Sequence, residues 1–107
     1  MPIGSFQAVK HHLANARLAL EIARPLVYRA AWFIAHDDPE REVAVSLAKA
    51  SASDAATLAA RVALQCHGAI GYTTEYDLHL FMKRAWALAA TWGDAAWHRA
   101  RVERAIL

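Results

Sequence analysis

With 107 residues, the chain is long enough for one domain with a modest core and too short for two. Its net charge is only +2 and its arginines are spread along the chain, which speaks against nucleic-acid binding. An apolar fraction of 57% is high for so short a chain, so we expect part of the apolar surface to meet partner subunits or further domains.

The cysteine content and the hydropathy pattern indicate the cellular compartment of the protein. Cys66 is the only cysteine, which excludes an internal disulfide and suits a reducing cytosol. No apolar run reaches the ~18 residues that a membrane-spanning helix needs. The N-terminus lacks the pattern of a signal peptide, because Lys10 and two histidines interrupt it. We therefore expect a cytoplasmic protein without a membrane span.

The first expected helix begins after Ser5 and is about 30 residues long, which exceeds most helices of globular proteins. Its apolar residues recur with a period of about 3.5, which is typical of helices packed nearly parallel in a bundle. Pro25 lies inside this helix and predicts a kink, since it removes one amide donor. The apolar positions are Phe6, Val9, Leu13, Ala16, Leu20, Ala23, Val27, Ala30 and Ile34.

The second expected helix runs to about His67. Asp38 is its predicted N-cap and Pro39 suits the first helical position. Gly68 then stands where a C-terminal cap favours a positive φ. Most residues of its inner stripe are small, which predicts a close approach to the first helix. This stripe comprises Ala44, Ala48, Ser51, Ala55, Leu58 and Val62.

Two shorter helices complete the predicted fold. Thr74 as N-cap, with Asp77 three residues later, resembles a capping box and starts the third helix. Residues 91–94 break the pattern, and Asp94 is the predicted N-cap of a fourth helix that ends at the C-terminus. We therefore predict an all-α fold, an antiparallel up-and-down four-helix bundle that forms a single domain over 1–107. The apolar face of the third helix is Leu78, Phe81, Met82 and Ala85.

The chemistry-bearing side chains are compatible with ordinary structural roles. Six histidines raise the possibility of a metal site, and Glu75 and His79 are four residues apart on one helix face. A di-iron bundle needs Glu-x-x-His pairs with further carboxylates on facing helices, and these are absent. We therefore expect no metal and place the histidines at the surface or half-buried. Cys66 is expected to be a packed, inert thiol.

Arginines and tryptophans each allow two interpretations. Arg99, Arg101 and Arg104 could bind an anion, but a solvated face shared with Glu103 is more common. The tryptophans could line a ligand cleft, but among so many alanines we expect them to fill gaps in the bundle. They stand at Trp32, Trp86, Trp92 and Trp97. The Gly68-x-x-Gly71 turn lacks the preceding strand of a dinucleotide fingerprint, so by spacing alone it is a helix cap and a corner.

Several segments together nevertheless resemble a known family. They occur in matching order and spacing at residues 3–11, 28–32, 46–50, 65–72, 74–76 and 82–84. On these segments the chain resembles, over essentially its whole length, the C-terminal helical domain of the acyl-CoA dehydrogenase family. In that family two subunits share each FAD, and this domain follows a helical domain and a β-domain.

The resemblance implies a set of cofactor-side residues. The family's Gln-x-x-Gly-Gly turn contacts FAD bound mainly in the neighbouring subunit, and it corresponds to Gln65, His67 and Gly68. Ala69 replaces the second glycine, and its methyl group would crowd a close backbone approach. A further cofactor-contacting glutamine of the family corresponds to Gln7.

Two departures from the family pattern imply that this chain carries no catalytic residue. Many members place their catalytic glutamate where this chain has Trp92, whose indole has no basic lone pair. The family's neighbouring threonine is replaced by Asp94. In this respect the chain resembles actinobacterial subunits that lack the glutamate and pair with a competent partner. The family's arginine and Phe-Gly would lie before Met1, so we expect a fragment or a truncated chain.

Two functional hypotheses follow. In the first, the chain is the FAD-contacting and oligomerisation domain of a flavoprotein oxidoreductase of lipid metabolism. The complete enzyme would dehydrogenate acyl-CoA thioesters at the α,β carbons, pass electrons to an electron-transfer flavoprotein and form a homo- or hetero-oligomer. The chain alone would be inactive, would lack FAD and would self-associate. In the second hypothesis, the chain is a non-enzymatic helical interaction module that binds no flavin.

Overall fold

The structure, a computed structural model, describes residues 3–68 and 75–107, with side chains described for 7–66 and 77–107. Within these ranges every regular element is a helix, which confirms the all-α class. The helices are α1 (Ile3–Ala35), α2 (Arg41–Gly68), α3 (Glu75–Ala90) and α4 (Ala95–Ile106). No helix in this part of the chain combines the length and apolar character needed to cross a membrane.

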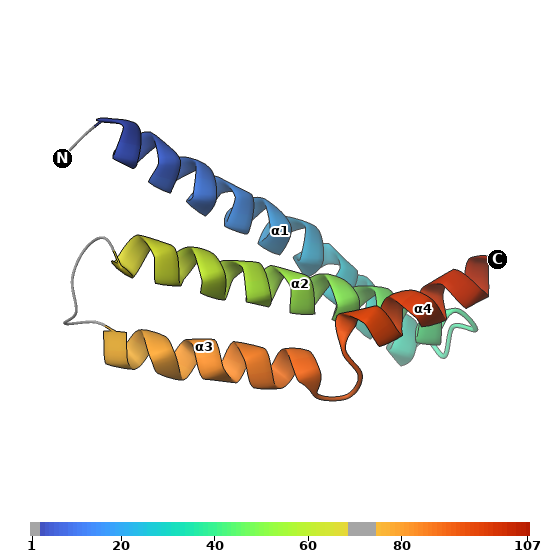
Figure 1. Ribbon diagram of the computed structural model, residues 1–107. Coiled ribbons are helices and arrows are strands. Elements are labelled where there is room, and N and C mark those ends of the chain that lie inside the picture. The colour runs from blue at the N-terminus through green and yellow to red at the C-terminus, as the bar shows by residue number, and fades with distance from the viewer. Residues whose placement is uncertain (1–2, 69–74) are drawn as a thin grey trace.

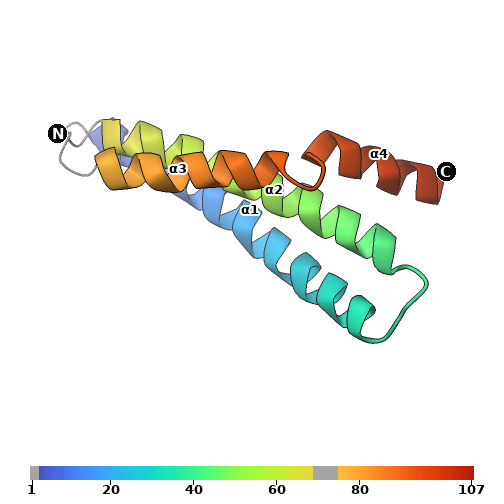
Figure 2. The same cartoon turned by 90° about the horizontal axis from the view of Figure 1, so that it is seen from below.

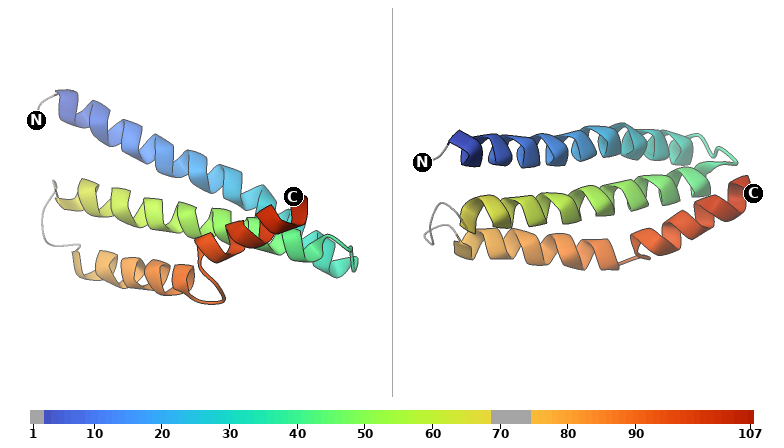
Figure 3. Two further views of the ribbon diagram at one scale, coloured as in Figure 1. Left: turned by 45° about the vertical axis from the view of Figure 1, so that its right-hand side comes forward. Right: turned by 45° about the horizontal axis from the view of Figure 1, so that its top comes forward.

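Helix α2 is the central element of an elongated molecule measuring 53 × 26 × 24 Å. α1 packs antiparallel along one side of α2, and α3 returns antiparallel along another side (Figure 1). After a short turn, α4 continues in the general direction of α3, so α3 and α4 follow one another along α2 (Figures 2 and 3). The predicted up-and-down order of four helices is not confirmed, because the chain bends at residues 91–94 without reversing there.

The corner between α1 and α2 contains the predicted side-chain bond of Asp38, but α2 begins at Arg41 rather than at Pro39. Asp37 adopts a φ of 49°, and the Asp38 N–H donates to the Phe33 carbonyl at 3.0 Å, which closes the last turn of α1. The Asp38 carboxylate accepts from the Glu40 N–H at 2.8 Å, as an N-cap side chain does. The regular part of α2 begins just afterwards at Arg41. Thr74, the predicted cap of α3, lies outside the described residues.

Small residues form the contact between α1 and α2, as predicted. Ala30, Ala44 and Ala48 are buried together and make up the centre of the core at this end of the helix pair. Because alanine extends only to Cβ, it allows the two helix axes to approach closely. Three larger side chains pack around this centre and are partly buried: Leu26, Phe33 and Val45. α1 remains helical through Pro25, and the predicted kink stays a prediction.

Much of the predicted apolar stripe of α1 is not covered. Ala23 and Ala30 are buried, but Leu20 and Val27 on the same stripe are 49% and 43% exposed. On α3, Met82 is buried whereas Phe81 of the same predicted face is exposed. The expectation that the tryptophans fill gaps is wrong, since Trp32, Trp86, Trp92 and Trp97 are all exposed. α4 packs mainly against α2, so no described element covers this side of the α1–α2 pair.

Candidate functional site

The structure brings most of the predicted cofactor-side residues to one end of the molecule. α1 begins and α2 ends at this end, so Gln7 near the start of α1 lies at the same end as Gln65 (Figures 1 and 3). Both glutamine side chains are exposed. α2 ends at Gly68, one residue beyond the predicted end at about His67, so Gly68 is the last residue of the helix rather than the cap that the sequence predicted. The side chain of His67 and the whole of Ala69 lie outside what the structure describes.

A second group of polar residues lies where α3 ends and α4 begins. The Lys49 Nζ donates to the carbonyl oxygens of Leu88 at 3.1 Å, Ala89 at 3.4 Å and Gly93 at 3.2 Å. Ser53 Oγ lies 3.0 Å from the same Nζ, so the three N–H groups of the ammonium are shared among four oxygens. The last carbonyls of a helix lack partners within it and form the negative end of its dipole. The Lys49 ammonium group therefore caps α3 and holds this end against α2.

His98 fixes the other side of the same turn. Its Nε2 lies 2.9 Å from the Trp92 carbonyl oxygen and its Nδ1 lies 3.0 Å from Ser46 Oγ. A carbonyl only accepts, so Nε2 carries a proton and donates to Trp92, while Nδ1 shares a hydrogen bond with the Ser46 hydroxyl. His98 and Ser46 are buried. This corrects the expectation that the histidines are at the surface or half-buried, because α4 carries His98 against α2.

The turn between α3 and α4 has an unusual backbone. Trp92 and Gly93 have φ angles of 59° and 88°, in the left-handed region that costs a residue with a side chain about 1–3 kcal/mol. Asp94 then caps α4, as predicted, by accepting from the Trp97 N–H at 2.8 Å. The Trp92 side chain is 91% exposed. The fixed turn thus presents an indole to the solvent.

The cap of α4 gives a first testable prediction. Asp94→Ala should lower the free energy of unfolding by about 1 kcal/mol, because the Trp97 N–H loses its acceptor. The measurement is urea denaturation of the 107-residue chain. Asp54→Ala is the matched control, since Asp54 is an exposed aspartate that only pairs with Arg99, and it should change stability by less than about 1 kcal/mol. Equal losses in the two variants would contradict the cap.

Two arginines of α4 form ion pairs at the surface, but their acidic partners are not Glu103, which the sequence predicted. Arg99 pairs with Asp54 at 2.7 Å, and Arg101 pairs with Glu42 at 3.4 Å. Both acidic partners belong to α2 rather than being Glu103 on the same helix, so these pairs contribute to docking α4. The Asp54–Arg99 pair is largely exposed and contributes at most about 1 kcal/mol.

Metal ligation has no support within the described ranges. No three side chains among His, Cys, Asp and Glu gather there in a way that could hold an ion. Cys66 is a buried free cysteine, in keeping with the predicted packed thiol.

Comparison with known proteins identifies the family. A family model described as acyl-CoA dehydrogenase, C-terminal domain, matches residues 1–107. The chain belongs to the acyl-CoA dehydrogenase family. It is 35% identical over 106 residues to a probable acyl-CoA dehydrogenase, YngJ, of Bacillus subtilis, covering 99% of this chain and 28% of that protein.

Two mycobacterial proteins are also similar to this acyl-CoA dehydrogenase domain. The acyl-CoA dehydrogenase IpdE2 of Mycobacterium tuberculosis is 40% identical over 84 residues, covering 78% of this chain and 24% of IpdE2. The acyl-CoA dehydrogenase FadE34 of the same organism is 37% identical over 95 residues, covering 88% of this chain and 13% of FadE34. The chain thus spans between 13% and 28% of the length of these curated relatives, and no solved structure matches it significantly.

Within this acyl-CoA dehydrogenase domain the two polar regions are well separated. α3 starts at the end of the molecule that carries Gln65 and runs to the turn that carries Trp92 (Figure 1). A helix of 16 residues is about 24 Å long. Gln65 and Trp92 therefore do not belong to one compact site within this chain.

Proposed function

We propose that this chain is the FAD-contacting and oligomerisation domain of an acyl-CoA dehydrogenase-like flavoprotein. The complete enzyme dehydrogenates acyl-CoA thioesters at the α,β carbons in the cytoplasm, as a homo- or hetero-oligomer that passes electrons to an electron-transfer flavoprotein. The observation that carries the proposal is the family match over 1–107, together with the placement of Gln7 and Gln65 at one end of the molecule.

The described residues could contact one side of a bound FAD but could not enclose it. The amides of Gln7 and Gln65 are exposed and supply both hydrogen-bond donors and acceptors, which suit the polar edge of a dinucleotide. The N-termini of α1 and α3 point to the same end, and such termini favour phosphate groups (Figure 1). Exposed side chains cannot exclude water from a flavin by themselves, so a second chain or domain must enclose it. His67, Gly68 and Ala69 stay proposed members of this contact.

Catalysis needs a base from another polypeptide or domain. Bound FAD would supply the acceptor for the β-hydride of the thioester, and the reaction would also need a base for the α-proton. Trp92 cannot serve as that base, because its indole N–H only donates. Its indole is exposed to solvent on a turn that Lys49 and His98 hold in place. We therefore propose that the 107-residue chain alone oxidises no acyl-CoA.

Flavin retention tests the proposal. The chain is co-expressed with a full-length acyl-CoA dehydrogenase, the complex is purified through a tag on the short chain, and its flavin absorbance is measured. We expect a flavin-containing complex in which Gln65→Ala weakens flavin retention about tenfold, the effect of losing one good hydrogen bond. Arg61→Ala, an exposed change one turn earlier on α2, is the matched control and should retain flavin.

The alternative function, a helical interaction module without flavin, makes the opposite prediction. It is favoured by the exposure of Gln7 and Gln65, since neither side chain is held in a preformed cradle. A purified complex without flavin would support the module. Oxidation of acyl-CoA by the 107-residue chain alone would contradict both functions.

A further inference from the structure

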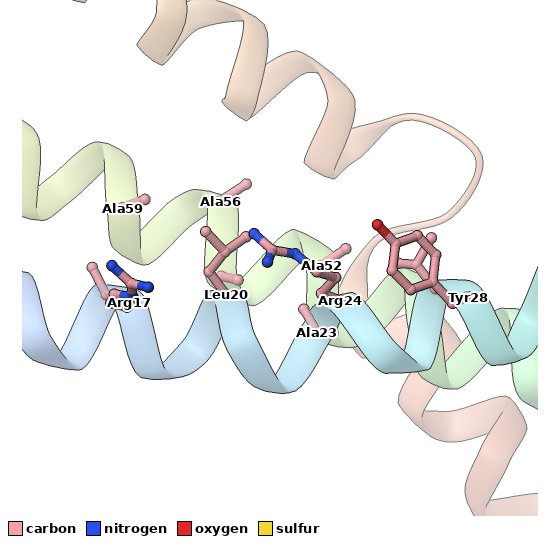
Figure 4. A pocket seen from close by; sticks show the side chains of 11 residues that line it. Arg17, Leu20, Ala23, Arg24, Tyr28, Ala52, Ala56 and Ala59 are labelled. Carbon is pink, nitrogen blue, oxygen red and sulfur yellow. The ribbon is translucent and has the colours of Figure 1, made fainter.

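An apolar hollow lies between α1 and α2, along the middle of the two helices. Its volume is about 450 Å³, which is within the usual range of small-molecule sites. Alanines of α2 form its floor, and Leu20 and Val27 of α1 form one wall (Figure 4). The alanines of the floor are Ala52, Ala55, Ala56 and Ala59.

The polar side chains of this hollow are two arginines and a tyrosine. Arg17, Arg24 and Tyr28 reach from α1 towards α2 along the open side of the hollow (Figure 4). No carboxylate is among the lining residues in the described part of the chain. A guanidinium group only donates hydrogen bonds, and its fork matches the two oxygens of a carboxylate. The lining therefore complements an acid group attached to an apolar body.

The ion pairs at this rim leave one positive charge unmatched. Arg17 Nε and an Arg24 guanidinium nitrogen lie 3.8 and 3.5 Å from the same oxygen of Glu21. Two guanidinium groups thus converge on one carboxylate, which does not itself line the hollow. Both pairs are exposed, and exposed pairs are weak, so a ligand carboxylate can compete with Glu21 for the arginines.

A second hollow continues this surface towards α3. It measures about 390 Å³ and is lined by Phe81 and Met82 of α3 together with alanines of α2. Ala56 and Ala59 line both hollows, so the two adjoin along the alanine ridge of α2. Among the described residues, no charged side chain lines the second hollow. The combined surface thus has a cationic end at α1 and an uncharged end at α3.

We propose that the two hollows together bind a free fatty acid. Its carboxylate lies at Arg17 and Arg24, and its alkyl chain crosses the alanine ridge into the hollow beside α3. Binding removes apolar surface of both the alkyl chain and the ridge from water, which is the main favourable contribution. The site shares no residue with the proposed flavin contact, so the inference goes beyond the proposed function and does not rest on it.

A series of ligands tests the match of head and tail. Isothermal titration of the 107-residue chain with dodecanoate, kept below its micellar concentration, should show saturable binding. The dissociation constant should be below about 1 mM, as ordinary ligand efficiency gives for a molecule of this size. Acetate has the head without the tail, and dodecyltrimethylammonium has the tail with a cationic head. Each should bind at least ~tenfold more weakly, because one half of the site is left unmatched.

Dodecanoyl-CoA separates a free acid from a thioester as the occupant. It carries the same tail but has no carboxylate next to it, so the two arginines gain no bidentate partner there. It should bind at least ~tenfold more weakly than dodecanoate, and tighter binding of the thioester would overturn the proposal.

A matched pair of arginine variants tests the carboxylate contact. Arg24→Gln should weaken dodecanoate binding about threefold to tenfold, because an exposed charge-assisted hydrogen bond is lost. Arg61→Gln is the control, since Arg61 is an exposed arginine of α2 that does not line the hollow. It should change the dissociation constant by less than about twofold.

A second pair of variants tests the path of the alkyl chain. Ala56→Phe fills the floor that both hollows share and should weaken dodecanoate binding at least ~tenfold. Ala96→Phe adds the same ring at an exposed position of α4 and should leave binding unchanged. Far-ultraviolet circular dichroism checks that the variants remain helical, and the ligand series on the unchanged chain does not depend on them.

Three results would each overturn the proposal. They are the absence of saturable dodecanoate binding, equally strong binding of dodecyltrimethylammonium, and equal effects of Arg24→Gln and Arg61→Gln. A second copy of the chain covering the hollows would give the first of these results. Flavin retention does not enter these measurements, so failure of the fatty-acid site is distinguishable from failure of the cofactor role.

Discussion

Gly93→Ala should lower the free energy of unfolding by about 2–4 kcal/mol, the sum of backbone strain and a lost hydrogen bond. Gly93 has a φ of 88°, which disfavours any residue with a Cβ. A Cβ at this position would lie 3.0 Å from His98 Nε2 and 3.0 Å from Trp97 Cε3. His98 Nε2 donates to the Trp92 carbonyl, so moving the ring away weakens the bond that fixes the turn.

Urea denaturation followed by circular dichroism measures this loss. Trp92→Ala is the control on the same turn, because it keeps a Cβ at a φ of 59° and removes only an exposed side chain. Its effect should stay within about 0.5 kcal/mol, as for most surface substitutions. Gly93→Ala should also cost less when His98 is already replaced, because part of its penalty is the displaced ring. A loss below about 1 kcal/mol would mean that the turn relaxes without strain.

The sequence predicted the helix ends well because the signals for them are local. Asp38 and Asp94 cap helices in the structure with bonds to backbone amides only two or three residues away. α2 ends within one residue of the predicted position, although Gly68 belongs to the helix rather than capping it. The small residues of α2 also correctly predicted its close contact with α1. Each of these features depends on neighbours in the chain or on a single pair of helices.

The arrangement of helices could not be predicted in the same way. Whether α4 reverses or continues the direction of α3 depends on Trp92 and Gly93 adopting positive φ, and nothing in the hydrophobic period specifies this. The tryptophans were assigned to the interior because apolar side chains are usually buried there. In the structure all four are exposed, because no described element packs over the helix faces and the turn that carry them.

The two polar regions show different limits of sequence analysis. Gln7 and Gln65 could be proposed only through the family resemblance, and their cofactor roles stay predictions. The group around Lys49 and His98 was missed, although Ser46, Lys49 and Ser53 recur three and four positions apart on an alanine-rich helix. Such residues lie on one face of the helix, and its small neighbours indicate that another element packs against that face. Because buried polar groups are hydrogen-bonded, the element that packs there should supply polar partners. The carbonyls at the end of α3 are such groups.

His98→Leu is the second substitution with a large expected effect, a loss of about 2–3 kcal/mol in the free energy of unfolding. The leucine fills a similar volume but leaves the Trp92 carbonyl and the buried Ser46 hydroxyl without the ring that joins them. His79→Leu is the matched control, because His79 is exposed on α3, and it should change stability by less than about 0.5 kcal/mol.

A double-mutant cycle with Ser46→Ala separates the hydrogen bond from the packing of the ring. The coupling energy between Ser46 and His98 should be about 1 kcal/mol, since their side chains meet at 3.0 Å and both are buried. If His98→Leu lowered the free energy of unfolding strongly but showed no coupling energy with Ser46→Ala, the loss would come from the hydrogen bond between His98 and the Trp92 carbonyl. If His98→Leu cost no more than His79→Leu, the turn would not depend on His98. Docking of α4 would then rest on other contacts with α2, including the pairs that Arg99 and Arg101 form with it.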